Sequence, residues 1–205
     1  MFTLYGAPGA GSAIVEIMFA LAGEPYQWVN VDGYDRPGAA RDTLAALNPL
    51  CQVPTLVLDD GGIMTESAAI ALLLLDSHPH LAPAAGTADR RQFYRLLVWL
   101  VANVYPTFTY GDYPERWAPG QPGELVASTD RYRERLYLWL ETQLGAGPYL
   151  FGDVVTLIDA YWPVLVHWGP RKPWFKQHAP RLFAMAEHVG RLPELQPILK
   201  ANTLV

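Results

Sequence analysis

A carboxylate and a hydroxyl stand side by side where a helix is expected to begin. Glu66 precedes Ser67, and the apolar residues that follow predict a helix from Ser67 onwards. The start of a helix offers free N–H groups and a positive dipole end, so Ser67 could hold a carboxylate while Glu66 pairs with an ammonium group. The pair therefore suits an amino-acid head group that carries both charges. The alternative is that Ser67 is only an N-cap and Glu66 only a first-turn partner of the dipole.

A proline stands directly before an apolar strand, in the segment 48–58, which reads NPLCQVPTLVL. Such a proline belongs at the edge of a sheet or in a turn. If the bond between Val53 and Pro54 were cis, the chain would bend there and leave the backbone of Val53 free to pair with a peptide-like ligand. Only about 5–6% of X–Pro bonds are cis, so this reasoning by itself favours an ordinary trans proline.

Ser12 is a third candidate, because it follows the loop Pro8–Gly11 and begins a helix that Gly23 ends. Its hydroxyl, nearby backbone N–H groups and the positive helix end could stabilise a thiolate, which would lower the thiol pKa from about 8.5. The alternative is a plain N-cap serine. The loop is not a P-loop, since the required Gly-Lys-Ser/Thr pattern is absent.

The remaining candidates have mainly structural interpretations. Cys51 is the only cysteine, which excludes a disulfide framework, and we interpret it as a small buried residue rather than a reactive thiol. The five histidines show no metal-ligand spacing, so no metal site is expected. Thr156 and Asp159 form a capping box that serves folding. Pro106 is expected to kink its helix.

Two groups of elements must position these residues. Strand and helix patterns alternate in the order β-α-β-α-β-β-α up to about residue 78, which predicts a mixed sheet covered by helices. The second half has apolar residues at helical spacing and no convincing strand, which predicts an all-α bundle. The expected domains are 1–78 and 88–205, joined by a Pro-, Ala- and Gly-rich linker at 79–87. The expected elements of the first half are strands at 2–5, 26–31, 55–58 and 63–65, and helices that begin at Ser12, Arg41 and Ser67.

Composition excludes several classes of protein. Of the 205 residues, 51% are hydrophobic and 17% are charged, so the chain is not intrinsically disordered. The net charge of −5 argues against a nucleic-acid partner. No apolar run is long enough for a membrane span and no signal peptide is evident, so we expect no membrane association and a cytoplasmic location. Residues 1–80 carry nine acidic and two basic residues, whereas residues 81–205 carry eleven acidic and thirteen basic ones, which again favours two units.

These motifs together resemble the soluble bacterial glutathione S-transferases over essentially the whole chain. The resemblance implies an α/β thioredoxin-like N-terminal domain and an all-α C-terminal helical domain. It further implies that Pro54 is cis, that the backbone of Val53 pairs with the cysteinyl part of glutathione, and that Glu66 and Ser67 hold its γ-glutamyl head group.

The N-terminal segment is similar to that of the beta-type enzymes, with one departure. Gly11 occupies the position of their catalytic cysteine, which excludes a mixed disulfide there, and Ser12 becomes the candidate for stabilising the thiolate. Tyr5 is a weaker rival, expected to be a structural residue of the first strand. Tyr105 falls where the beta type has a histidine, and Arg36 falls near a basic position that contacts the glycine end of glutathione.

The resemblance implies a transferase that uses glutathione as co-substrate and joins it to a largely apolar electrophile, a detoxification chemistry. It also implies a homodimer. A glutathione-binding protein of the same fold without turnover is the alternative, and a disulfide oxidoreductase is disfavoured because the cysteine pair is missing. The expected glutathione site comprises Ser12, Arg36, Gln52, Val53, Pro54, Glu66 and Ser67, and the expected electrophile pocket comprises Tyr105, Phe108 and Trp168.

Overall fold

The computed structural model describes residues 1–205 and divides them into two compact units. The first unit consists of Met1–Ala82 together with Gly190–Val205, and the second consists of Pro83–Val189. The sequence predicts one uninterrupted second domain, 88–205. The structure differs, because the C-terminal segment belongs to the first unit.

The reason for this difference is the last helix of the chain. Helix α11 (Gln196–Ala201) packs against α1 (Ser12–Ala22), and the short 3₁₀ turn η4 (Pro193–Leu195) does the same. Leu195 and Leu199 are buried there. Two apolar side chains on such a short segment give no sequence signal that tells which unit will cover them.

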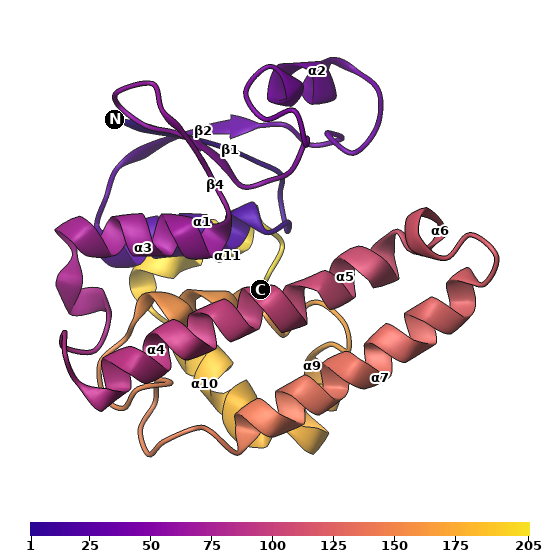
Figure 1. Ribbon diagram of the computed structural model, residues 1–205. Coiled ribbons are helices and arrows are strands. Elements are labelled where there is room, and N and C mark those ends of the chain that lie inside the picture. The colour runs from indigo at the N-terminus through magenta and orange to yellow at the C-terminus, as the bar shows by residue number, and fades with distance from the viewer. The chain divides into compact units, whose positions relative to one another are not determined.

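The first unit is built on a mixed sheet (Figure 1), which has four strands in the order β2-β1-β3-β4. Strands β1 and β2 are parallel, while β3 is antiparallel to both of its neighbours. This arrangement confirms the predicted mixed sheet and the α/β thioredoxin-like class of this part. The strands are β1 (Phe2–Gly6), β2 (Tyr26–Asn30), β3 (Thr55–Val57) and β4 (Ile63–Thr65).

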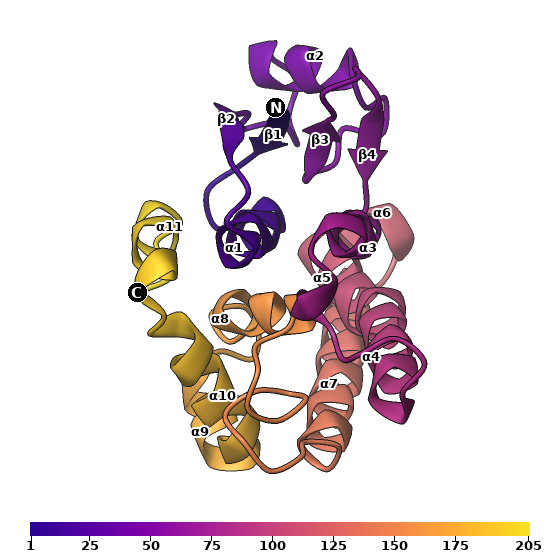
Figure 2. The same cartoon turned by 90° about the vertical axis from the view of Figure 1, so that its left-hand side faces the viewer.

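Helices cover both faces of this sheet. Figure 2 shows α1 and α3 (Ser67–Ser77) on one side of the strands and α2 (Ala39–Ala45) on the other. Helix α1 is apolar around almost its whole circumference, and Ser12 to Phe19 are all buried, as expected for a helix enclosed by protein. Gly23 ends α1 in the left-handed conformation, with a φ of 65°, which glycine adopts without steric cost.

The second unit contains only helices and irregular segments, apart from one isolated bridge between Tyr149 and Gly152. This confirms the predicted all-α character. No helix of the protein is both long enough and apolar enough to span a bilayer. The helices and turns that follow α3 are η1 (Pro79–Leu81), α4 (Ala88–Trp99), η2 (Leu100–Val104), α5 (Tyr105–Asp112), α6 (Pro114–Trp117), α7 (Pro122–Glu141), η3 (Leu157–Tyr161), α8 (Trp162–Leu165), α9 (Lys172–His178) and α10 (Pro180–Gly190).

Pro106 interrupts the regular helix, as its chemistry requires. The segment η2 between α4 and α5 is a π-helical turn, in which the N–H of Tyr105 donates to the carbonyl of Leu100, five residues earlier. A proline has no N–H to donate and its ring clashes with the carbonyl four residues before it, here that of Ala102. The wider turn accommodates Pro106 within a continuous helical segment.

Candidate functional site

The register of the sheet brings the three sequence motifs to one end of the first unit. Thr55 pairs with Tyr5 on one side and with Thr65 on the other. Pro54 precedes Thr55, Glu66 follows Thr65, and the loop that leads to Ser12 follows β1. The proline loop, the start of α3 and the start of α1 therefore converge at the same edge, although they lie far apart in sequence.

The loop before β3 is held by one buried side chain. Asn48 is 5% exposed. Its amide nitrogen donates to the carbonyl of Gln52 (3.2 Å) and to Oγ1 of Thr55 (3.1 Å), and its Oδ1 accepts the N–H of Leu50 (3.1 Å). The bond between Val53 and Pro54 is cis. The expectation from the family resemblance is thus confirmed, while the trans proline favoured by frequency alone is wrong.

The backbone of Val53 is left open by this loop. Neither its N–H nor its carbonyl takes part in a hydrogen bond within the chain, although Val53 itself is half-buried. A buried or half-buried peptide group normally finds a partner. An extended ligand backbone lying beside Val53 would supply both a donor and an acceptor. The side chain of the preceding Gln52 is exposed.

Glu66 has an unusual backbone conformation. Its φ is 66° and its ψ is 111°, in a region that a residue with a side chain rarely adopts. Its carbonyl accepts the N–H of Ile70 (3.0 Å), so Glu66 closes the first turn of α3. The side chain is exposed and forms no ion pair within the chain, whereas Ser67 beside it is buried. Strain of this kind concentrates at functional positions.

Ser12 is placed differently from the expectation. The whole residue, backbone included, is 0% exposed. The hydroxyl donates to the carbonyl of Ala7 and accepts the N–H of the same residue, both at 3.1 Å. The hydroxyl is thus engaged within the chain instead of facing a ligand. This closes the loop that precedes α1 into a compact turn.

The backbone at the start of α1 is not engaged in the same way. The N–H groups of Gly11 and Ser12 donate no hydrogen bond within the protein, whereas those of Ala10, Ala13 and Ile14 all do. Gly11 is the N-cap and has no side chain to cap the helix. Two adjacent free N–H groups at the positive end of an eleven-residue helix favour an anionic group.

Tyr5 and Cys51 belong to a small apolar cluster around Val31 and Leu44. Cys51 is 7% exposed and its Sγ lies 3.9 Å from the carbonyl of Pro49. This agrees with its interpretation as a small buried residue. Tyr5 is half-buried against the same cluster, which agrees with the structural role expected for it.

Arg36 forms no hydrogen bond or ion pair with the other predicted site residues. Its side chain is 80% exposed and pairs only with the neighbouring Asp35, at 3.7 Å. The segment that carries it follows β2, which runs parallel to β1 and therefore ends at the same edge of the sheet. The guanidinium group extends into solvent there and contacts none of the other motifs.

The three residues expected to contact an electrophile do lie together in the second unit. The ring centroid of Phe108 is 5.0 Å from that of Trp168 and 6.4 Å from that of Tyr105, and the Tyr105 and Trp168 rings are 5.8 Å apart. All three pairs meet edge to face, the favoured geometry for aromatic rings. We call these three residues the aromatic cluster. The guanidinium carbon of Arg133 lies 4.5 Å from the Phe108 ring centre.

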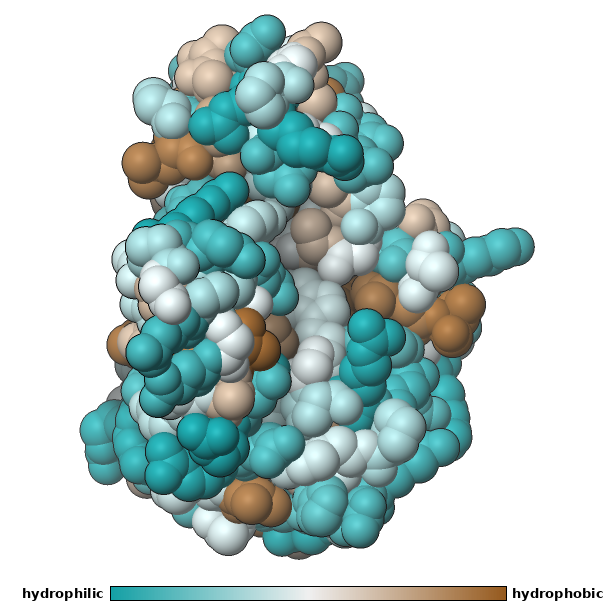
Figure 3. All heavy atoms as spheres, turned by 90° about the vertical axis from the view of Figure 1, so that its right-hand side faces the viewer, coloured by the Kyte–Doolittle hydropathy of each residue, from teal (hydrophilic) through white to brown (hydrophobic).

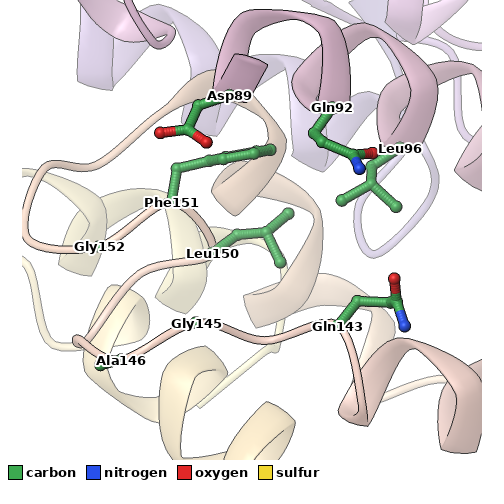
Figure 4. Close-up of a pocket in the computed structure, with 9 residues that line it drawn as sticks. All are labelled: Asp89, Gln92, Leu96, Gln143, Gly145, Ala146, Leu150, Phe151 and Gly152. Carbon is green, nitrogen blue, oxygen red and sulfur yellow. The ribbon is translucent and has the colours of Figure 1, made fainter.

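A separate cavity of about 300 Å³ lies elsewhere in the second unit (Figure 4). It opens between the start of α4 and the loop after α7, and Phe151 and Leu150 form its apolar wall. It contains none of the predicted site residues. Its lining consists of Asp89, Gln92, Leu96, Gln143, Gly145, Ala146, Leu150, Phe151 and Gly152.

Comparison with known proteins identifies the family. Residues 12–77 match the family model described as the N-terminal domain of glutathione S-transferase. The chain is 54% identical to the uncharacterized GST-like protein YncG of Escherichia coli K12 over 205 residues, which is 100% of both chains. It is 28% identical to the glutathione S-transferase GstA of Escherichia coli O157:H7, over 98% of both chains. Among solved structures, a sphingomonad glutathione S-transferase in complex with glutathione matches with a TM-score of 0.80 and 27% identity, over 99% of this chain and 100% of that one. This chain therefore belongs to the glutathione S-transferase family.

Proposed function

We propose that the protein is a glutathione transferase that stabilises the thiolate of glutathione for attack on a largely apolar electrophile. The observation that carries this proposal is the convergence of the proline loop, Glu66–Ser67 and the start of α1 at one edge of the sheet. These segments offer, in one place, an acid for an ammonium group, an open peptide backbone and two free N–H groups. Glutathione carries an ammonium, peptide bonds and a thiol, which match them.

Each part of glutathione has a partner in this proposal. The carboxylate of Glu66 pairs with the γ-glutamyl ammonium, and Ser67 at the start of α3 holds the adjacent carboxylate. The open N–H and carbonyl of Val53 pair with the cysteinyl backbone, in the bend set by Pro54. Gln52 and the solvent-exposed Arg36 face the glycine end, where the exposed guanidinium side chain has room to reach the terminal carboxylate.

The thiol lies at the start of α1, where Ser12 and Gly11 act through their backbone N–H groups. The thiol proton leaves to solvent, and the remaining negative charge on sulfur accepts hydrogen bonds from the two N–H groups. The thiolate then forms a bond to the electrophilic carbon, and the leaving group departs with the electron pair of the broken bond. Within the second unit, the aromatic cluster is our candidate for binding an apolar electrophile. The catalytic gain comes from thiolate stabilisation and proximity.

Two measurements test the proposal and separate it from binding without turnover. Titration calorimetry measures whether purified protein binds reduced glutathione. A conjugation assay with aryl halides, epoxides and α,β-unsaturated carbonyls then measures turnover above the uncatalysed rate. Binding with turnover of at least one electrophile is the expected result. Binding without turnover of any class would favour the non-catalytic alternative, and the absence of binding would refute both.

A further inference from the structure

A buried polar chain links the C-terminal segment to the loop before α1. Asn202 follows α11 and is 4% exposed. Its Oδ1 accepts the N–H of Gly9 (2.9 Å), and its Nδ2 donates to Oε1 of Glu16 (2.9 Å) and to the carbonyl of Ile198 (3.0 Å). All three groups lie in the first unit. The amide of Asn202 thus spans the gap between α11, α1 and the loop.

Glu16 fixes the direction in which this amide points. It is 6% exposed, in the middle of the apolar helix α1. Oε2 of Glu16 accepts the hydroxyl of Tyr26 (3.1 Å), so both of its oxygens act as acceptors. Because the Glu16 oxygens only accept hydrogen bonds, the amide nitrogen of Asn202 must face them. The amide oxygen of Asn202 then faces the N–H of Gly9.

Burying the carboxylate of Glu16 costs desolvation free energy, which supports a specific role for this residue. Burial raises the pKa of Glu16, while the hydrogen bonds from Asn202 and Tyr26 act against that rise. An apolar residue at position 16 would continue the enclosed face of α1 and avoid this desolvation. The carboxylate is instead matched by donors at both oxygens, which holds three separate segments in one arrangement.

The loop that is held in this way carries the free N–H groups. Gly9 lies at a φ of 71°, and a Cβ there would come within 3.4 Å of the Asn202 carbonyl oxygen, so the loop and the C-terminal segment are in close contact. Gly9 is two residues before Gly11 and three before Ser12. Anchoring the N–H of Gly9 therefore fixes the turn that presents the next free N–H groups.

We propose that Asn202, oriented by Glu16, is a positioning residue that holds the loop 7–12 so that the N–H groups of Gly11 and Ser12 point at the thiolate. This inference rests on the proposed function for its catalytic part. It assigns to the C-terminal segment a role in the glutathione site, through a contact with backbone and not with glutathione itself.

The first experiment measures the anchor in the ligand-free protein. Amide hydrogen exchange at Gly9 should be at least about tenfold faster in Asn202→Ala, because the N–H loses its acceptor. The isosteric Asn202→Asp should act in the same direction, since it places an oxygen opposite the Glu16 carboxylate. Glu16→Gln keeps an accepting oxygen for Asn202 and should leave exchange near the wild-type rate. Gln196→Ala is the control, because it removes other hydrogen bonds of the C-terminal segment, to the carbonyls of Gly190 and Leu192.

The second experiment measures the consequence for the site. Ultraviolet titration of bound glutathione should show the thiol pKa raised by about 1 unit in Asn202→Ala, with kcat near pH 6.5 lowered about tenfold and KM for glutathione within about threefold. Glu16→Gln and Gln196→Ala should retain the wild-type thiol pKa and kcat. A general loss of structure would not separate kcat from KM in this way.

The outcomes distinguish the inference from the proposed function. Unchanged exchange at Gly9 in both Asn202 variants would overturn the anchor, whatever the protein binds. Faster exchange with an unchanged thiol pKa and kcat would overturn the positioning role. A wild-type protein that binds no glutathione would instead refute the proposed function, and the exchange data would still decide whether Asn202 holds the loop.

Discussion

At the scale of single residues, Ser12 begins α1 as the sequence predicts, but its hydroxyl bonds to the backbone of Ala7 in the preceding loop. A serine at the start of a helix can cap it, bind a ligand or bond to the preceding loop, and the sequence does not distinguish these partners. The choice depends on the path of the loop. Here the turn at 7–12 brings both backbone groups of Ala7 within 3.1 Å of the hydroxyl.

We predict that Ser12→Ala affects stability more than chemistry. The substitution leaves the buried N–H of Ala7 without a partner, while the Ala7 carbonyl keeps the N–H of Ala10, and this should lower the free energy of unfolding by about 1–3 kcal/mol. The pKa of bound glutathione should stay close to the wild-type value. Urea denaturation and ultraviolet titration measure the two effects. Ser77→Ala is a matched control at a more exposed helix end. If the thiol pKa of bound glutathione rose by one unit in Ser12→Ala and not in the control, the Ser12 hydroxyl would stabilise the thiolate after all.

Glu66→Ala tests the head-group contact. Removing the carboxylate takes away the counter-charge of the γ-glutamyl ammonium, which should weaken glutathione binding by about 1.5–3 kcal/mol, the range for hydrogen bonds to charged groups. Titration calorimetry measures this directly. Asp59→Ala removes another exposed acid, from the turn between β3 and β4, and should bind normally. If the wild type, Glu66→Ala and Asp59→Ala bound glutathione with equal affinity, Glu66 would not contact the ligand.

At the scale of elements, apolar runs together with helix-start and turn residues located the strands and helices of the first half, although α1 is apolar around almost its whole circumference. These signals could not supply the register, which decides that Thr55 lies between Tyr5 and Thr65 and so brings the motifs together. They also missed the place of α11. One signal was present in the sequence: Glu16 is a lone acid in an apolar helix, and a buried acid needs partners from another segment.

The capping box of η3 is confirmed, with both of its reciprocal hydrogen bonds present. Asp159 is completely buried. Its carboxylate accepts the N–H of Leu150 (2.9 Å) and both the N–H and the hydroxyl of Thr156 (2.8 Å each). Burial nevertheless raises its pKa from 3.8 to about 6, against the effect of these bonds.

This shift gives a prediction with a defined sign. The pKa of Asp159 is higher in the folded protein than in the unfolded chain, so the folded protein binds more protons between about pH 4 and 6. The stability that Asp159 contributes is therefore largest below pH 4 and decreases as the pH rises through 6. Asp159→Asn places an N–H₂ group against the two donors of Thr156 and should destabilise the protein by about 1–3 kcal/mol near neutral pH. The stability difference between wild type and variant should be larger at pH 4 than at pH 7.

Urea denaturation at several pH values between 4 and 7 measures that difference. Asp153→Asn is the control, because Asp153 is an exposed acid in the segment before η3. Its stability difference from wild type should be small at every pH. A difference for Asp159→Asn that does not change with pH would show that burial does not raise the pKa of this carboxyl group.

At the scale of the whole molecule, surface composition bears on association. Figure 3 shows a face on which hydrophobic residues occur in small groups among hydrophilic ones. Several large apolar side chains are well exposed, and two of them, Tyr94 (46%) and Val98 (56%), lie four residues apart on α4 and so share one face of that helix. Exposed apolar side chains that share a face favour a contact with another protein surface.

We predict that the protein is a homodimer whose interface includes this face of α4. Unequal charge of the two halves of the chain favours an arrangement in which opposite charges meet across a two-fold axis, and a two-fold interface presents the same residues twice. Light scattering at micromolar concentration should therefore give about twice the chain mass of 22.8 kDa.

Val98→Glu would place two like charges near the two-fold axis and remove two apolar contacts, so the mass of this variant should fall towards that of one chain. Val154→Glu introduces the same change at a valine that is 64% exposed in a loop, and it should remain dimeric. A wild-type mass of one chain would refute the dimer, whereas a dimeric Val98→Glu protein would exclude this face of α4 from the interface.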